Sequence, residues 1–246
     1  MNATYAKYEF LRLFRNKRFF IFSIGIPLAL FLTIGGANKD QTLDQGAFNI
    51  SFLLYYMVGM AGYGATIAAL AGGARIAAER SVGWNRQLRL TPLTPRNYFQ
   101  VKVLTGYFMA MLSIALVYAA GVALGVRIHP IGDWFQMTGL MLVALIPFLA
   151  MGIVFGHLLT VDSIGPALGG SSALFGFLGG QWTPLPATGA LHFIAECIPS
   201  YWMTQASHVG IGGAGWPAKG WLVVGIWAVA MTVVAVQVYR RDTRRV

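Results

Sequence analysis

Long apolar runs alternate with short polar segments along the whole chain. Each run is close to the roughly 20 residues that a helix needs to cross a bilayer. The six runs cover residues 19–36, 50–73, 104–126, 135–159, 164–181 and 220–239, and none of them contains Asp, Glu, Lys or Arg. This pattern predicts an all-α polytopic membrane protein with six transmembrane helices, organised as a single transmembrane domain over residues 1–246.

Composition supports that interpretation and excludes several others. Hydrophobic residues make up 57% of the chain and charged residues only 11%, which is unlike a soluble domain. The net charge of +10 would suit nucleic acid only if the cations shared one soluble surface, but apolar runs separate them. A single cysteine, Cys197, excludes a disulfide framework and a cysteine-based metal site. We therefore expect the lipid bilayer as a partner, and no nucleic acid.

The distribution of cations predicts the orientation. With the N-terminus placed inside, fifteen of the eighteen Lys and Arg residues lie in the inner segments and three in the outer ones. Cytoplasmic loops of membrane proteins carry such an excess of Lys and Arg. We expect both termini and residues 74–103 to be cytoplasmic in a multi-pass protein of the membrane.

Residues 1–18 mix five cations with aromatic and aliphatic side chains. This mixture is typical of a helix that lies in the headgroup region, with its apolar face towards the acyl chains. A secretory signal peptide is the competing interpretation, but the charged region and the following apolar run are both too long for one. The pattern predicts an interfacial helix over residues 1–18.

The only long polar segment in the middle of the chain is 74–103. Apolar residues alternate there with Arg80, Arg86 and Arg89, which favours an amphipathic helix on the cytoplasmic side. Pro92 and Pro95 mark its end. The alternative is a plain basic loop. As a docking helix, its candidate contact residues are Glu79, Arg80, Gly83, Trp84, Arg86, Leu88, Arg89, Thr91 and Pro92.

Residues 182–217 are apolar but interrupted by prolines and glycines. A continuous span there would also put the basic C-terminus outside, against the charge distribution. The segment therefore predicts a re-entrant outer hairpin between the fifth and sixth spans, and the alternative is an exposed outer loop. Its candidate residues are Pro184, Glu196, Pro199 and Tyr201.

Candidate chemistry is sparse. His192 and Glu196 have i, i+4 spacing, but no further ligand or paired acid completes a metal or hydrolase site. The sequence has no G-x-x-x-x-G-K-[ST] motif for nucleotide phosphates. Ionisable residues are missing from the interior of the apolar runs, which disfavours a proton-coupled transporter. We expect no enzyme activity, no metal and no cofactor on this chain.

The order of these segments resembles the permease subunits of type-2 ATP-binding cassette exporters, such as drug and antibiotic efflux systems. The most specific part of the resemblance is Glu79-Arg80, Gly83, Leu88, Thr91-Pro92-Leu93 and Lys102, at the coupling helix of that family. Gly179-Gly180, Pro184 and Pro199-Ser200-Tyr201 resemble its second, looser signature. One departure is Ser81, where many members carry a second acid.

The resemblance implies a partner for each function that the chain lacks. A separate ATPase subunit would bind ATP and Mg and would dock on the coupling helix. A second permease copy or a paralogue would complete a dimer in a bacterial inner membrane. The cargo would be a hydrophobic or amphiphilic small molecule. Aromatic residues that could line its path are Phe31, Phe52, Tyr55, Tyr56, Tyr63, Phe175 and Phe177. An ion-coupled secondary transporter and a non-transporting assembly or regulatory protein are the alternatives.

Overall fold

The computed structural model describes residues 3–15, 17–44, 49–128, 130–186, 188–211 and 215–244. The elements in these ranges are α1 (Ala3–Arg15), α2 (Lys17–Leu30), the π-helical turn η1 (Phe31–Gly35), β1 (Thr42–Asp44), β2 (Asn49–Ser51), α3 (Phe52–Ser81), α4 (Trp84–Arg89), α5 (Pro95–Ala123), α6 (Ile131–Ala144), α7 (Ile146–Leu158), α8 (Val161–Leu178), α9 (Ala190–Glu196), α10 (Pro199–His208), the 3-10 turn η2 (Val209–Ile211) and α11 (Ala218–Arg244).

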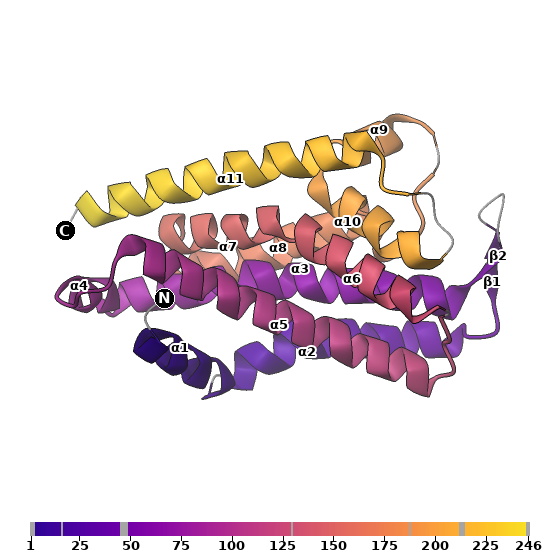
Figure 1. The fold of residues 1–246 in the computed structure, drawn as a ribbon, viewed down its shortest axis with the longest axis horizontal. Helices are drawn as coiled ribbons and strands as arrows, with labels where there is room; N and C mark the ends of the chain where they lie inside the picture. Colours follow the sequence, from indigo (N-terminus) through magenta and orange to yellow (C-terminus); the bar gives the residue numbers. More distant parts are fainter. Residues whose placement is uncertain are drawn as a thin grey trace.

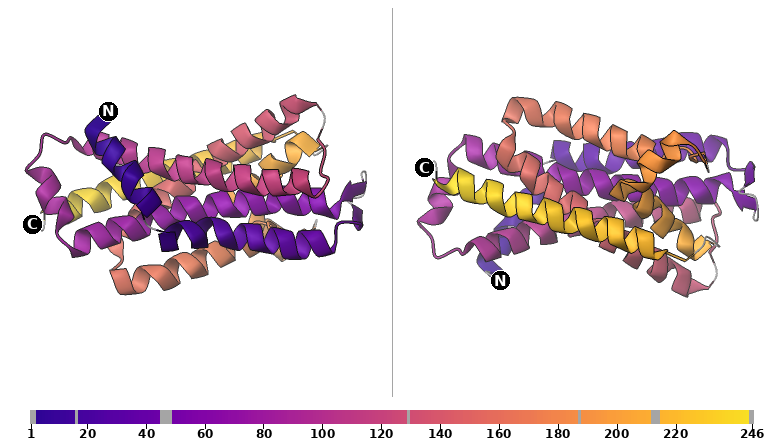
Figure 2. Two further views of the ribbon diagram at one scale, coloured as in Figure 1. Left: turned by 90° about the horizontal axis from the view of Figure 1, so that it is seen from below. Right: turned by 90° about the horizontal axis from the view of Figure 1, so that it is seen from above.

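Helix α3 runs through the centre of the bundle, and the other long helices surround it (Figures 1 and 2). In the most apolar 18-residue stretch of α3, 89% of the residues are buried, whereas in the most apolar stretch of α11 only 17% are buried. A helix that is apolar on all sides suits a position inside a protein or a membrane. The bundle therefore has one central helix, α3, and a peripheral one, α11, that presents most of its surface outwards.

In the part of the chain that the structure describes, four helices are long and apolar enough to cross a membrane. They are α3, α5, the pair α6–α7 taken together, and the stretch Ala218–Asp242 of α11. The first predicted run, 19–36, divides into α2 and the π-helical turn η1, and Ser23–Gly35 is counted as a shorter apolar helix. The fifth run corresponds to α8, which contains Pro166 and is not among the four. The chain is thus a mostly helical membrane protein.

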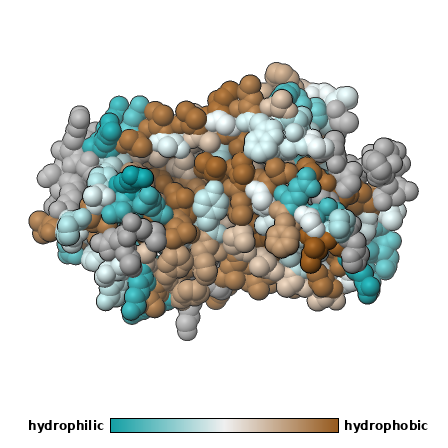
Figure 3. All heavy atoms as spheres, viewed as in Figure 1, coloured by the Kyte–Doolittle hydropathy of each residue, from teal (hydrophilic) through white to brown (hydrophobic). Residues whose placement is uncertain are grey.

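The two ends of the bundle differ. Both marked chain ends and α4 lie at one end, and the β1–β2 hairpin lies at the other (Figure 1). We call them the α4 end and the hairpin end. Hydrophobic residues cover the middle of the visible face, and hydrophilic ones gather towards the two ends (Figure 3). This arrangement fits a protein whose middle lies in hydrocarbon.

The start of the second apolar run is a strand and not a helix. Residues Asn49–Ser51 pair antiparallel with Thr42–Asp44, with Leu43 opposite Ile50. Helix α3 begins directly afterwards at Phe52. The pairing satisfies backbone groups of the link between η1 and α3.

Glycines allow α3 and α7 to pack backbone against backbone. A Cβ atom added at Gly152 would lie 2.6 Å from the carbonyl oxygen of Ala69, and one added at Gly156 would lie 2.8 Å from that of Gly73. Small residues permit such close approach between membrane helices. By contrast, Gly165 and Gly169, which share the same spacing in the sequence, meet no neighbouring atom within 4 Å.

The segment 182–217 contains two short helices. Helix α9 has 7 residues and α10 has 10, so neither can cross a bilayer. The break between them falls at Cys197 and Ile198, directly before Pro199, as the sequence predicts for a proline at that position. Helix α10 packs mainly against α6, and less extensively against α3, α11 and α8.

Candidate functional site

The candidate docking helix is shorter than the sequence pattern predicts. Helix α3 continues to Ser81, Gly83 turns the chain with a left-handed φ of 69°, and α4 has only 6 residues. Thr94 then caps α5, accepting a hydrogen bond from the backbone of Asn97, with Pro95 as the first helical residue. The prediction that Pro92 and Pro95 end the amphipathic segment agrees with the restart of helix at Pro95, but Gly83 adds a break that the sequence pattern did not predict.

The connection between α3 and α5 projects from the α4 end and exposes apolar side chains. Val82 is 74% exposed and Leu90 is 90% exposed. Leu88 is half-buried, and its carbonyl accepts a hydrogen bond from the hydroxyl of Thr91. Pro92 is exposed. The side chains of Arg86 and Arg89 lie outside the part of the chain that the structure describes.

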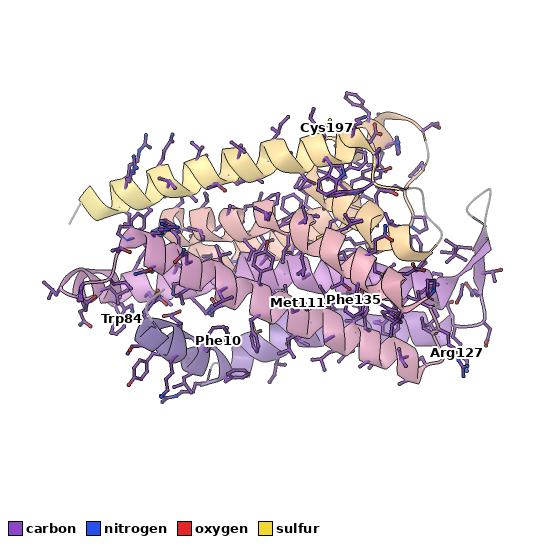
Figure 4. The ribbon with its side chains drawn as sticks, in the orientation of Figure 1. Phe10, Trp84, Met111, Arg127, Phe135 and Cys197 are labelled. Carbon is purple, nitrogen blue, oxygen red and sulfur yellow. The ribbon has the colours of Figure 1, made fainter. Side chains whose placement is uncertain are left out.

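Trp84 marks the place where α4 meets the N-terminal helix (Figure 4). Its side chain is half-buried, and the guanidinium of Arg12 lies 5.7 Å from the centre of its ring. A cation over a tryptophan face is attracted by the electron density of the ring. The contact joins α1 to α4 at the α4 end.

A buried ion cluster lies directly beneath this contact. We define the Lys102 cluster as Glu9, Arg12, Glu79 and Lys102. The Lys102 ammonium is 2.6 Å from Glu79 Oε1 and 2.9 Å from Glu9 Oε2. The Arg12 guanidinium is 3.2 Å from both carboxylates. The side chains of Glu9, Glu79 and Lys102 are almost completely buried. Since these residues belong to α1, α3 and α5, the cluster links the three helices.

The charges in the cluster depend on one another. Burial by itself raises the pKa of Glu9, but the nearby charge of Lys102 and its hydrogen bond outweigh burial and lower that pKa below its usual value. Glu9 therefore remains ionised in the folded protein at neutral pH. Buried charges are tolerated when they are paired and hydrogen-bonded in this way.

A second ion cluster holds the last helix. Arg80 Nε lies 2.9 Å from Asp242 Oδ2 on α11, and Nη1 donates to the carbonyl oxygens of Gly156 and Leu159. The ring of His157 is 3.0 Å from the same Asp242 oxygen. We call these residues the Asp242 cluster. They connect α3 and α11 and satisfy carbonyl groups at the end of α7.

Glu79 and Arg80 thus both have partners within the chain. Sequence reasoning named them as contact residues but missed Glu9 and Asp242. A signal for both exists in the sequence: Glu9 is the only acid in residues 1–18, and Asp242 is the only acid in residues 240–246. A single acid within a basic segment is a candidate for an ion pair, but the sequence does not say which cation it meets.

A cleft of about 570 Å³ opens beside the Lys102 cluster, between α1 and α3. Its lining includes Arg12, Arg15 and Arg75 together with Glu9 and Glu79. No group of His, Cys, Asp and Glu residues that could hold a metal ion occurs among the described residues. The arrangement of charges therefore holds helices together at the α4 end and offers no recognisable metal centre there.

Most of the aromatic residues proposed for a transport path pack inside the chain. Phe31, Tyr55, Tyr56, Tyr63 and Phe175 are buried, Phe52 is half-buried and Phe177 is 50% exposed. Among them, only Tyr63 lines a large apolar groove, which has a volume of about 600 Å³ and lies between α2, α3 and α8. The polar groups in the described lining of this groove include Ser23 and Ser172.

The residues of the segment 182–217 form a network of their own. Glu196 accepts a hydrogen bond from Lys219, which lowers the pKa of its carboxyl group. The backbone carbonyl of Glu196 accepts a second hydrogen bond from the indole of Trp202. The ring of Tyr201 meets that of His192 edge-on, at 5.6 Å. Pro199 is buried at the start of α10, and Pro184 is exposed.

Comparison with known proteins identifies the class. No family model matches the sequence. The chain is 30% identical over 199 residues to the protein named "Putative transport permease YvfS" of Bacillus subtilis (strain 168), and the match covers 78% of each chain. The chain belongs to the transport permease family. As a permease it is a membrane protein with a transport role, which agrees with its apolar helices.

Proposed function

We propose that this permease is the transmembrane subunit of an ATP-driven exporter, acting with a separate ATPase subunit. The observation that carries the proposal is the α3–α4–α5 connection. It exposes Val82 and Leu90 at the end of the bundle where both chain ends lie, and ion clusters hold its base (Figure 1). A small apolar projection on a rigid base is suited to insertion into a cleft of a partner.

Helix lengths provide a way to transmit movement. Helices α3 and α5 have 30 and 29 residues, so each is about 44 Å long, at 1.5 Å per residue. The hydrocarbon core is only about 30 Å thick, so both helices extend beyond it to α4. Because Lys102 joins them through Glu79, a displacement of α4 by the ATPase moves both helices together. The helices α1 and α11, attached through Glu9 and Asp242, move with them.

The proposed topology has six spans with both termini and α4 in the cytoplasm of a bacterial inner-membrane protein. The spans are α2 with η1, then α3, α5, α6–α7, α8 and α11. Helix α1 lies in the cytoplasmic headgroup layer, where exposed Tyr8, Leu11 and Phe14 suit acyl chains. Helices α9 and α10 form the re-entrant outer hairpin between the fifth and sixth spans, since both are too short to cross.

The cargo we propose is a hydrophobic or amphiphilic small molecule, such as a drug or an antibiotic. The groove between α2, α3 and α8 carries the argument, because it combines an apolar wall with the hydroxyl groups of Ser23, Tyr63 and Ser172. It opens on one side of a single copy, and a second copy or a paralogue would cover it. ATP and Mg would bind to the partner ATPase and not to this chain.

Retention of an ATPase subunit tests this function. The permease is co-expressed with a Walker-motif ATPase encoded beside it and purified in mild detergent. We expect Val82→Glu combined with Leu90→Glu to reduce the retained ATPase about tenfold, which corresponds to ~1.4 kcal/mol. Gly83→Trp should also reduce it, because a φ of 69° strains any side chain.

The matched control is Ile131→Glu. Ile131 is also 74% exposed. It begins α6 four residues after Arg127, and Arg127 lies at the opposite end of the bundle from Trp84 (Figure 4). Retention of the ATPase by both loop variants would contradict docking through α4. Absence of any associated ATPase in the wild type would instead favour an ion-coupled transporter or a regulatory protein.

A further inference from the structure

A second groove lies on a different side of the bundle from the proposed cargo groove. It has a volume of about 550 Å³, and α5, α7 and α11 form its walls. None of the residues that line it also lines the groove between α2, α3 and α8. A ligand in this second groove would therefore occupy a separate site.

The groove exists because α5 and α11 separate from each other along their length. The rings of Phe99 on α5 and Tyr239 on α11 meet at the α4 end, with centroids 4.9 Å apart. Away from this contact the two helices diverge (Figure 1). Helix α7 closes the bottom of the gap with Ile146, Leu149 and Ile153.

The chemistry of the lining changes along the groove. Arg96 and Gln100 lie near the α4 end, and both side chains are exposed. Further along α5, the groove is lined by the apolar side chain of Val103. The hydroxyl of Tyr107 donates to the carbonyl of Leu142, so this polar group is satisfied by the protein. The groove is thus cationic and polar at its mouth and apolar in its depth.

Its length matches one leaflet of a bilayer. Arg96 and Tyr107 are eleven positions apart on one helix, which corresponds to a rise of about 16 Å. Half of a hydrocarbon core of about 30 Å is about 15 Å. Arg96 and Tyr107 are therefore separated by about the thickness of one hydrocarbon leaflet.

A second arginine follows the lining on α11. Val236 lines the groove, and Arg240 follows it by one helical turn on α11, so both residues share a face of that helix. Arg240 is exposed. The guanidinium of Arg96, at the mouth of an apolar slot, complements an anionic headgroup attached to an acyl chain.

We propose that this groove binds an anionic phospholipid of the cytoplasmic leaflet. Arg96 contacts the phosphate of the headgroup, and one acyl chain lies along Val103, Leu149 and Ala235. The choice of leaflet rests on the topology of the proposed function. The lipid would connect α5 to α11, so that it stabilises the contact between the docking connection and the last helix without being transported.

Native mass spectrometry of the full-length permease tests the site. The protein is reconstituted with equal amounts of phosphatidylglycerol and phosphatidylcholine that carry the same acyl chains, and the lipids retained after mild detergent extraction are counted. The wild type should retain phosphatidylglycerol preferentially. Arg96→Gln should weaken that retention about tenfold, the factor expected for one charge-assisted hydrogen bond. Arg127→Gln, an exposed arginine beyond the other end of α5, should leave it unchanged.

A filling variant tests the apolar part without disturbing the core. Thr232 is exposed and lines the groove, so Thr232→Trp should occupy the slot and reduce retention of both lipids. Val233→Trp is the matched control, because Val233 is the next residue on α11, is 48% exposed and is not part of the lining. Thermal unfolding of all four variants checks that each is folded.

Several outcomes would overturn the proposal. Equal retention of the two lipids, or unchanged retention in Arg96→Gln and Thr232→Trp, would exclude an anionic lipid site. Lipid adducts confined to monomers would mean that a second copy covers the groove. A retained non-lipid compound that Thr232→Trp expels would mean that the groove takes cargo. ATPase retention is measured in parallel. If the lipids show no selectivity while the ATPase stays bound, only this lipid site is refuted. If lipid selectivity is seen but no ATPase is retained, the proposed function is refuted and the lipid site is not.

Discussion

Lys102 on α5 lies 2.6 Å from Glu79 on α3, and both side chains are almost completely buried. The two residues are on the helices that lead into and out of α4, so the ion pair joins the two sides of that connection at its base. Glu9 adds a second carboxylate from α1 at 2.9 Å. One ammonium group therefore holds three helices that are separate in sequence.

Removing that ammonium should destabilise the permease strongly. Lys102→Met leaves two buried carboxylates without their main partner, which costs about 3–5 kcal/mol in comparable cases. We expect a lower temperature of thermal unfolding in detergent than for Lys39→Met, which changes an exposed lysine in the link before β1. Adding Glu79→Gln to Lys102→Met should recover part of the loss. Equal unfolding temperatures for the two single variants would contradict a structural role for the cluster.

Acid should weaken the attachment of α1. The pKa of Glu9 is lowered in the folded protein, since the effect of Lys102 outweighs burial. The stabilisation is therefore present above the unfolded-state pKa of about 4.3 and is lost as the pH falls through the lower folded-state pKa. The unfolding temperature of the wild type should exceed that of Glu9→Gln at pH 7, and the difference should shrink below about pH 4. A difference that is constant from pH 7 to pH 3 would show that Glu9 does not contribute through its charge.

A single methyl group at the α3–α7 contact should also be costly. In Gly152→Ala the new Cβ would lie 2.6 Å from the carbonyl oxygen of Ala69, and backbone cannot yield as a flexible side chain does. We expect a loss of about 1–3 kcal/mol, as for other overpacked contacts. Gly225→Ala on α11 is the control, because nothing lies within 4 Å of its added Cβ, and it should be neutral. Thermal unfolding of both variants distinguishes close packing from a general effect of glycine removal.

Thiol labelling tests the proposed topology. In a Cys197→Ser background, cysteines at Asn38, Gly132 and Ala218 should react with an impermeant reagent applied from outside. A cysteine at Gln87 in α4 should react only after the membrane is opened. All four native residues are at least partly exposed, so lack of access would reflect the membrane and not burial. Labelling of position 87 from outside would reverse the whole topology.

The sequence by itself determined the class of protein. Apolar runs of span length can be stable only in hydrocarbon or in a protein core, so their positions predict membrane helices without knowledge of their packing. Most of the helices lie close to those runs. The break before Pro199 was predictable for a similar reason, because proline restricts the residue before it wherever it occurs.

Local chemistry explains the boundaries that the periodicity did not predict. The prolines at 92 and 95 predict where the amphipathic segment ends, but the break at Gly83, which separates the end of α3 from the short α4, was not predicted. The stop at Ser81 and the restart at Pro95 depend on backbone conformation at single residues. Hydrophobic periodicity averages over a whole turn and does not detect such points.

Only the tertiary structure decided which residues meet. The spacing of Gly165 and Gly169 is the same as that of Gly152 and Gly156, but close helix contact occurs only at the second pair. Likewise, Glu79 and Arg80 are neighbours in the chain, yet they point to Lys102 and Asp242 in different clusters. Pairing across 23 or 162 residues depends on how helices lie against one another. Neither apolar periodicity nor charge counting records that relationship, because both describe each helix alone, whereas contact energies arise between helices.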